Sequence, residues 1–298
     1  MFAMSAVEKL ALGTVQWGVP YGLYNQEGMT STKTVKAILD EALAGGIHLL
    51  DTASLYGESE AVLGRNVLDE FRIVTKTPKF QVEHIERQEV DGLVNTFRAS
   101  LKKLNCASIY GLLIHDAEDI LKPGGLMLIQ ALVALKMQGL VDKIGVSVYD
   151  GKQVTRILKI FTPDIVQLPI SILDQRVLRD GTLDSLYQLG VEVHARSVFL
   201  QGLLLMPADE IPIYFNPIRS LLNQFHMAAN DQNLTAIQAS LTFVRDLTQI
   251  SKVLVGVQNL QQFQDCARDF KIDASFEAKN LNCDEIKFVN PSMWNIGS

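Results

Sequence analysis

Short, apolar, β-rich runs alternate along this chain with longer segments of helical periodicity. Such a rhythm is typical of parallel βαβ units, in which helices cover both faces of the sheet. Eight runs of this kind occur, and eight is the number of parallel strands that closes a (β/α)8 barrel. The expected strands are residues 10–15, 48–51, 72–76, 109–115, 143–148, 164–169, 191–195 and 252–256.

Between these runs, apolar residues recur at intervals of three and four, which predicts amphipathic helices. Ser31 is placed to cap the first of them, and Gly45 follows its end as expected for a helix C-terminus. The expected helices are residues 32–43, 58–67, 90–103, 126–137 and 151–160.

Three prolines interrupt residues 203–218, which predicts a long loop over one end of the barrel. Loops of this kind often close over ligands. The tail, residues 276–298, is expected to form a last helix and an irregular end.

A doubly wound open sheet would produce the same alternation of strands and helices. That fold usually carries a GxGxxG motif after its first strand, where it binds a dinucleotide. Residues 13–18 read GTVQWG, which is a different pattern. The length of 298 residues also suits a barrel of roughly 250 residues with modest insertions. We therefore predict an α/β protein with a TIM-barrel fold, a single domain over residues 1–298.

Composition narrows the class of partner. The chain is 48% hydrophobic and has a formal net charge of -6, so no basic surface predicts binding to nucleic acid or to an anionic membrane. No run of about 18 apolar residues predicts a membrane span. Cys106, Cys266 and Cys283 form neither a CxxC pair nor a zinc-binding spacing, so we expect no metal site and a reducing, cytoplasmic location. No coiled-coil pattern predicts an oligomer.

Polar residues cluster where three consecutive strands are expected to end. Asp51 ends the second strand with Tyr56 in the following loop, Lys76 ends the third, and His115 ends the fourth. Each has an ordinary structural explanation, such as a helix cap, a packed aromatic residue or a strand-end lysine. Active sites of (β/α)8 barrels lie at the C-terminal ends of the strands, and charged groups there need partners or a function. Their joint placement predicts an active site.

The motif around Tyr56 resembles the signature of the aldo/keto reductase family. Residues 51–60 read DTASLYGESE and are followed by Leu63 and Gly64. Further matches occur in family order at residues 75–76 (TK), 112–115 (LLIH), 145–147 (GVS) and 201–204 (QGLL), and the resemblance covers about residues 8–270.

The resemblance implies an NAD(P)H-dependent oxidoreductase that interconverts a carbonyl, in an aldehyde, ketone or sugar, and its alcohol. Tyr56 would donate the proton in reduction and accept it in oxidation. A free phenol has a pKa of about 10, so the neighbouring Lys76 ammonium, held by Asp51, is expected to favour the ionised form. His115 would orient the substrate carbonyl. Trp17 is expected to join Tyr56 and His115 in contacting the small-molecule substrate.

The resemblance also implies a cofactor site for NADP or NAD. Ser147 would bind the nicotinamide carboxamide, but the Ser-Asn pair of the family is Ser147-Val148 here. Residues 253–266 contain no Lys or Arg for a 2′-phosphate, which leaves the choice between NADP and NAD open. The expected cofactor residues are Gly13, Thr14, Asp51, Ser147, Gln167, Arg196, Ser197, Leu200, Gly202, Gly256, Gln258 and Gln262.

Two other functions fit the same residues. A non-catalytic member of the fold could use a bound nicotinamide to sense redox state and regulate a partner protein. A barrel aldolase or lyase could form a Schiff base on Lys76. The presence of all four catalytic candidates favours the oxidoreductase, and dinucleotide binding would discriminate against the Schiff-base enzyme.

Overall fold

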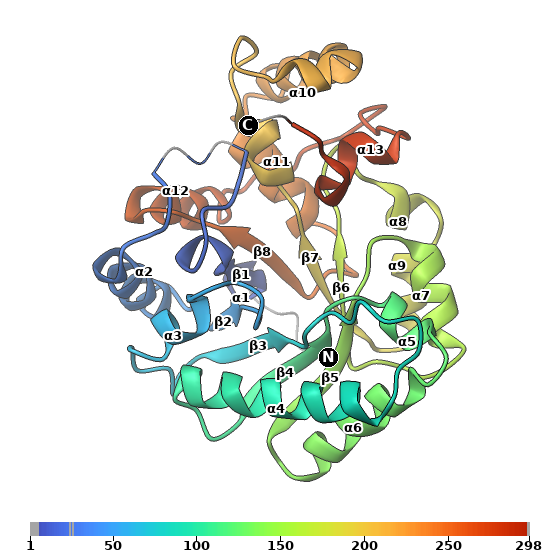
Figure 1. The fold of residues 1–298 in the computed structure, drawn as a ribbon. Coiled ribbons are helices and arrows are strands. Elements are labelled where there is room, and N and C mark those ends of the chain that lie inside the picture. The colour runs from blue at the N-terminus through green and yellow to red at the C-terminus, as the bar shows by residue number, and fades with distance from the viewer. Residues whose placement is uncertain (1–5, 24, 26, 297–298) are drawn as a thin grey trace.

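Eight parallel strands form a closed barrel in the computed structural model, which describes residues 6–23, 25 and 27–296 (Figure 1). Each strand pairs with the next along the chain, and β8 closes the ring on β1. The predicted (β/α)8 barrel is confirmed. The strands are β1 (Leu10–Gly13), β2 (Leu49–Asp51), β3 (Arg72–Lys76), β4 (Ile109–Ile114), β5 (Val141–Ser147), β6 (Ile165–Pro169), β7 (Glu192–Arg196) and β8 (Lys252–Gly256).

Helices surround the strands in Figure 1. The α-helices are α1 (Ala6–Lys9), α2 (Thr32–Ala44), α3 (Ser59–Leu63), α4 (Arg87–Leu104), α5 (Glu118–Leu121), α6 (Leu126–Met137), α7 (Gly151–Leu158), α8 (Arg176–Arg179), α9 (Thr182–Gln188), α10 (Arg219–Asp231), α11 (Ala236–Arg245), α12 (Leu260–Asp269) and α13 (Ile286–Val289). Four 3-10 segments complete the described chain: η1 (Val15–Trp17), η2 (Leu200–Leu205), η3 (Ile213–Ile218) and η4 (Pro291–Met293).

Element boundaries depart from the predictions in a few places. The first strand ends at Gly13, because the chain turns at once into η1. The helix predicted for residues 58–67 shortens to α3, which ends with Gly64 as its C-cap. The loop predicted for residues 203–218 contains the end of η2 and all of η3. The predicted cap of α2 is present, since the Ser31 side chain accepts a hydrogen bond from the Thr34 amide.

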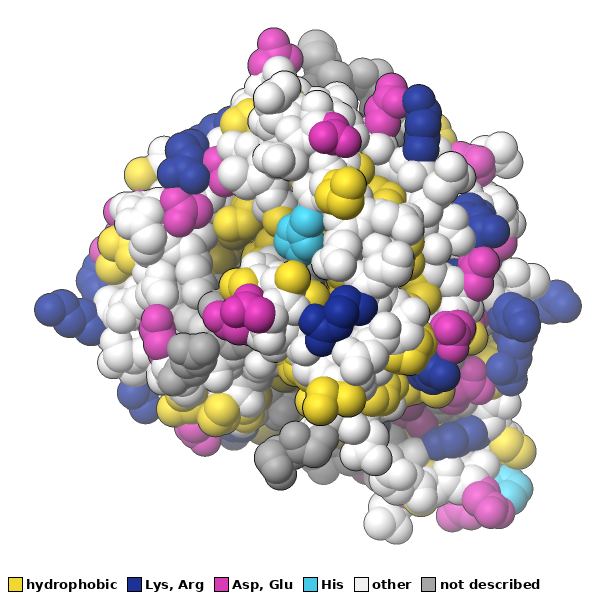
Figure 2. All heavy atoms as spheres, turned by 90° about the horizontal axis from the view of Figure 1, so that it is seen from above, with side chains coloured by type: hydrophobic (Ala, Val, Ile, Leu, Met, Phe, Trp, Pro, Cys, Tyr) yellow, Lys and Arg dark blue, Asp and Glu magenta, His cyan; other side chains and the backbone are white. Residues whose placement is uncertain are grey.

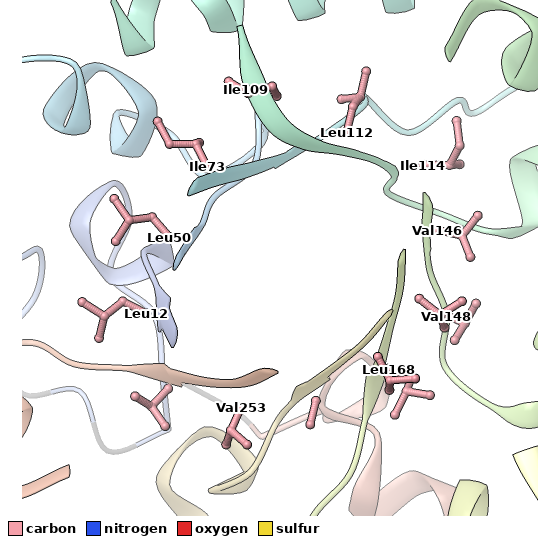
Figure 3. Packing of buried hydrophobic residues seen from close by; sticks show 14 of the residues in the cluster. Leu12, Leu50, Ile73, Ile109, Leu112, Ile114, Val146, Val148, Leu168 and Val253 are labelled. Carbon is pink, nitrogen blue, oxygen red and sulfur yellow. The ribbon is translucent and has the colours of Figure 1, made fainter. Parts of the chain in front are cut away.

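The strands separate two sets of apolar side chains by their period of two. Leu12, Leu50, Ile73 and Val146 point outward from the ring of strands toward the helices (Figure 3). The neighbouring inward positions fill the barrel centre with a smaller cluster: Ala11, Leu49, Val74, Leu113, Ile165 and Leu254. Because each strand is buried on both faces, the runs are continuously apolar, which is why they are readable in the sequence.

A second apolar cluster joins η2, η3 and α10 to the C-terminal tail. Its centre is aromatic, with the rings of Phe215 and Trp294 in edge contact at 4.9 Å between centroids. In Figure 1, α10 projects beyond the ring of barrel helices. The tail therefore packs against the inserted segments that follow β7.

The surface carries charges of both signs. On the face drawn in Figure 2, Lys and Arg side chains lie among Asp and Glu side chains, with apolar side chains between them. On this face, charges of opposite sign therefore partly offset one another. Within the described residues, no helix is both long enough and apolar enough to span a membrane.

Candidate active site

The inward-facing residues at the C-terminal ends of the strands gather around one cavity of about 490 Å³. The barrel register sets their level: Gly13 lies beside Asp51 and Gly256, and Ser147 lies beside Gln167. Seven strands contribute one such residue each, and His115 directly follows β4: Gly13, Asp51, Lys76, His115, Ser147, Gln167, Arg196 and Gly256. The period of two therefore places apolar side chains in the barrel centre and functional groups one level above.

A buried ion pair between Lys76 and Asp51 lies on the floor of the cavity, which the strand-end residues form. The Lys76 Nζ atom donates to Asp51 Oδ1 at 2.8 Å, to Asp51 Oδ2 at 2.7 Å and to the Thr52 carbonyl at 2.9 Å. Burial disfavours the charge on Lys76, but attraction to Asp51, and then to Tyr56, outweighs this effect and raises the pKa of Lys76. Lys76 is therefore held as an ammonium by Asp51 and by the Thr52 carbonyl, and it also interacts with Tyr56.

Gln167 holds the other side of the same carboxylate. Its Nε2 atom donates to Asp51 Oδ1 at 2.7 Å, across 116 residues of sequence. Asp51 thus accepts from β3 and from β6, which fixes its position at the centre of the floor. With its amide nitrogen engaged, Gln167 has its carbonyl oxygen left as a hydrogen-bond acceptor.

Tyr56 lies above the ion pair, in the loop between β2 and α3. The Lys76 Nζ atom lies 5.0 Å from the centre of the Tyr56 ring. Two glycines hold this loop against the one after β1: a Cβ atom on Gly18 would lie 1.8 Å from the Tyr56 carbonyl oxygen. Gly57 has a φ of +54°, and a Cβ there would lie 2.4 Å from the Gly18 oxygen. The position of Tyr56 therefore depends on backbone contact that only glycine permits.

Buried hydroxyl groups reinforce that loop. Thr14 Oγ1 donates to the Asp51 carbonyl at 3.0 Å and lies 2.7 Å from Ser59 Oγ. Ser59 Oγ donates to the Thr14 carbonyl at 2.9 Å. Thr14 is fully buried and forms part of the cavity wall.

His115 faces Tyr56 across the cavity, with the two rings edge-on and their centroids 6.0 Å apart. Burial, followed by the positive charges of Lys76, Lys79 and Arg196, lowers the pKa of His115 to about 3. Its buried Nδ1 atom has no hydrogen-bond partner among the described residues. At neutral pH the ring is therefore uncharged and can donate a hydrogen bond to a ligand or accept one from it.

The wall after β7 has unusual backbone geometry. Ser197, Leu200 and Gln201 have positive φ values of 62°, 47° and 55°, and Gly202 follows at 95°. Positive φ is costly for residues with a side chain and is frequent at ligand sites. Arg196, just before this stretch, places its guanidinium 4.8 Å from the centre of the Tyr149 ring and donates to the Val148 carbonyl at 3.0 Å.

The comparisons with known proteins agree with this geometry. The model of the aldo/keto reductase family matches residues 9–284, which is most of the chain. The chain belongs to the aldo/keto reductase family. The resemblance drawn from residues 51–60 is thereby confirmed.

Solved structures share the fold at low sequence identity. AKR11C1, an aldo-keto reductase from Bacillus halodurans in its holo form, has a TM-score of 0.73 and 20% identity, covering 96% of this chain and 94% of its own. PA4992, a proposed aldo-keto reductase from Pseudomonas aeruginosa, has a TM-score of 0.65 and 20% identity, covering 88% and 89%. At such identity these likenesses show the fold alone. A comparison with curated proteins gave no match.

Two predicted aldo/keto reductase site residues lie outside the cavity wall. Trp17 is fully buried, and its Nε1 atom donates to the Val257 carbonyl at 3.1 Å, so it cannot contact a substrate in this arrangement. Leu200 is also fully buried and packs in the second apolar cluster, so only its backbone could approach a ligand. The predicted residues that do line the cavity are Gly13, Thr14, Asp51, Tyr56, Lys76, His115, Ser147, Gln167, Arg196, Ser197, Gly202, Gly256, Gln258 and Gln262.

The sequence predicts no role for three other lining residues. Gln16, Tyr149 and Asp265 carry no motif of their own, and only the closing of the barrel brings them together. Tyr21 lies at the rim, where Gln201 Nε2 donates to its hydroxyl at 2.9 Å. This bond links the loop after β1 to the loop after β7.

Several features suit a dinucleotide. Gln16 Oε1 and Gln258 Nε2 are buried polar atoms that line the cavity and have no partner among the described residues. A Cβ atom on Gly256 would lie 2.4 Å from Gln16 Oε1, so glycine at this position leaves room for the Gln16 amide. The described residues contain no group of three or more His, Cys, Asp or Glu side chains that could hold a metal ion.

Proposed function

We infer that this member of the aldo/keto reductase family is an oxidoreductase of carbonyl and alcohol groups. We propose that it works with a nicotinamide dinucleotide, NADP or NAD, and that Tyr56 donates the proton when a carbonyl is reduced and accepts it when an alcohol is oxidised. The observation that carries the proposal is the grouping of Tyr56, the Lys76–Asp51 pair and His115 at one end of a single cavity.

The proton chemistry follows from the charges around Tyr56. The Lys76 ammonium lies 5.0 Å from the centre of the Tyr56 ring, so a positive charge faces the group from which the proton would leave. Asp51 keeps Lys76 charged and in place, so Asp51 and Lys76 act on the proton through Tyr56. Neutral His115 can donate a hydrogen bond to the substrate oxygen, which orients the carbonyl toward Tyr56.

The remaining residues would hold the dinucleotide, which supplies the hydride when bound. Ser147 and the free carbonyl oxygen of Gln167 suit the carboxamide, with Gly13 leaving room for the ring. The planar guanidinium of Arg196 could stack on the nicotinamide. Ser197 and Gly202, in the strained stretch after β7, suit the pyrophosphate.

The Schiff-base alternative is disfavoured by the state of Lys76. A nucleophilic lysine must lose its proton. Here three acceptors surround Nζ, and the pKa of Lys76 is raised. The redox-sensor alternative uses the same cofactor site but gives no role to the hydroxyl of Tyr56.

The proposal is tested by titrating the purified protein with NADPH and with NADH while following nicotinamide emission. Saturable binding of either one is expected. Binding of neither, together with borohydride trapping of a carbonyl substrate on Lys76, would overturn the proposal in favour of the Schiff-base enzyme.

A further inference from the structure

We infer that the dinucleotide of this enzyme is NAD rather than NADP, because the arm of the cavity remote from Tyr56 presents carboxylates and neutral amides. The inference rests on the proposed function. The two dinucleotides differ at one position of the adenosine ribose, which carries a hydroxyl in NAD and a phosphate in NADP. The choice therefore depends on the charge of the protein around that position.

The cavity itself fixes where adenosine must lie. Tyr56, Lys76 and His115 mark the reactive end, so the nicotinamide must reach them. The same cavity continues to the start of α12 and to Ile237 of α11. We place the adenosine of a dinucleotide with its nicotinamide at Tyr56 in this arm. The arm is lined by Ile237, Gln258, Gln262, Asp265 and Cys266.

Carboxylates outnumber cations around this arm. None of the described residues that line it is Lys or Arg. Asp265 lies in the wall, and Glu27 reaches the start of α12, where its Oε1 atom accepts from Asn259 Nδ2 at 3.1 Å. Lys252, the first residue of β8, lies at the end of that strand away from the cavity and donates to the Glu8 carbonyl.

Arg268 is the nearest cation on α12, and it is already engaged. Its Nη1 atom lies 2.7 Å from Asp265 Oδ1 and its Nε atom 2.9 Å from Asp269 Oδ1. One guanidinium shared by two carboxylates leaves the group negative. A phosphate dianion placed beside it would meet repulsion, whereas a hydroxyl would not.

The start of α12 has also used donors that an anion would need. The backbone N–H of Gln262 donates to Asn259 Oδ1 at 2.9 Å, and the backbone N–H of Gln258 donates to Gln262 Oε1 at 2.8 Å. The side-chain donors that remain on lining residues are neutral amides: the buried Nε2 of Gln258, which has no partner among the described residues, and the Nε2 of Gln262. Neutral amides suit a ribose hydroxyl better than a phosphate dianion, which needs a cation beside it.

The test compares dissociation constants for NADH and NADPH, measured by nicotinamide fluorescence at low and at physiological salt. We expect NADH to bind about tenfold or more tightly, which corresponds to about 1.4 kcal/mol, and the difference to shrink as salt screens the carboxylates. NADPH binding as tightly as NADH, or more tightly, would overturn the inference while leaving the proposed function intact. Binding of neither would instead overturn the proposed function.

Variants locate the cause. Gln258→Arg is expected to raise affinity for NADPH about tenfold, with the affinity for NADH changed far less. Asp265→Asn removes a charge without changing the shape of the side chain and should reduce the preference for NADH over NADPH. This second variant keeps the test valid if Gln258→Arg fails to fold. Gln264→Arg is the matched control, because Gln264 lies outside the cavity wall and bonds to Glu41. An equal gain in all three variants, or no gain in the first two, contradicts the assignment.

Discussion

Single residues at the strand ends were the most predictable part of the site. Asp51, Lys76 and His115 each follow a buried apolar run, so the barrel rule alone brings them to one mouth. Trp17 shows the limit: its indole bonds to Val257, 240 residues away, and no local pattern reveals that partner. The bond from Gln167 to Asp51 was hidden for the same reason, since it exists only after the barrel closes.

The buried ion pair predicts strong coupling between two residues. Lys76→Met alone leaves the Asp51 carboxylate buried with one bond from Gln167, which should cost about 3–5 kcal/mol of stability. Adding Asp51→Asn removes the stranded charge, so the double variant should be more stable than Lys76→Met. Chemical denaturation of the wild type, the Lys76→Met and Asp51→Asn single variants and the double variant gives the coupling energy. Additive effects would contradict the pairing.

His115 predicts a dependence of stability on acid. Its pKa of about 3 in the fold lies below the value of about 6.5 for an unfolded histidine. The unfolded chain therefore binds more protons between these values, and His115 makes stability fall as the pH drops from about 6.5 toward 3. His115→Gln should lose less stability than the wild type between about pH 7 and pH 5. Denaturation curves at both pH values check this, and equal losses would count against the buried neutral imidazole.

At the scale of elements, the count of strands was predictable because burial on both faces makes each strand a distinct apolar run. The segments after β7 were not. Prolines predicted a loop for residues 203–218, whereas η2 and η3 form there and pack with α10 on the tail. That packing depends on partners about 70 residues later, such as Lys287, whose carbonyl accepts from Tyr214.

The contact between the loops after β1 and β2 yields a prediction at this scale. Gly57→Ala would force a Cβ to 2.4 Å from the Gly18 oxygen and should displace Tyr56, with a stability loss of about 1–3 kcal/mol and a larger loss of turnover. Gly139→Ala is the control, because Gly139 also has a positive φ, of +72°, but has open space around it. Carbonyl-reduction assays and thermal melts separate the two. Equal loss of turnover in both variants would contradict this account, because the contact between the new Cβ atom and the Gly18 oxygen exists only in Gly57→Ala.

The two ends of the barrel differ in role: one end carries the cavity, and the other carries a charged cluster around Glu192 that stabilises the fold. Opposite the cavity, Glu192 at the start of β7 accepts from Tyr110 Oη at 2.7 Å, pairs with Lys143, and lies 2.7 Å from His194 Nε2. Burial opposes the charge of Glu192, but these hydrogen bonds, led by that of His194, keep its pKa well below the ordinary value. The stability it contributes is therefore present above about pH 4.5 and is lost on acidification.

Glu192→Gln should accordingly lower stability by about 1–3 kcal/mol while leaving dinucleotide affinity unchanged, because the site lies at the other end of the strands. Glu118→Gln, which breaks an exposed pair with Arg156, should cost at most about 1 kcal/mol. Thermal melts and the fluorescence titration measure both. Loss of dinucleotide affinity in folded Glu192→Gln would contradict the separation of the two ends.

The most direct test of the catalytic assignment is the Tyr56→Phe variant, with Tyr187→Phe on the exposed face of α9 as its control. Reduction of an activated aldehyde such as 4-nitrobenzaldehyde is measured beside the dissociation constant of the reduced dinucleotide. Since the hydroxyl moves a proton and does not anchor the cofactor, kcat should fall about 100-fold or more in Tyr56→Phe with the dissociation constant nearly unchanged. Full turnover, or equal loss of turnover and binding, would contradict the role given to Tyr56.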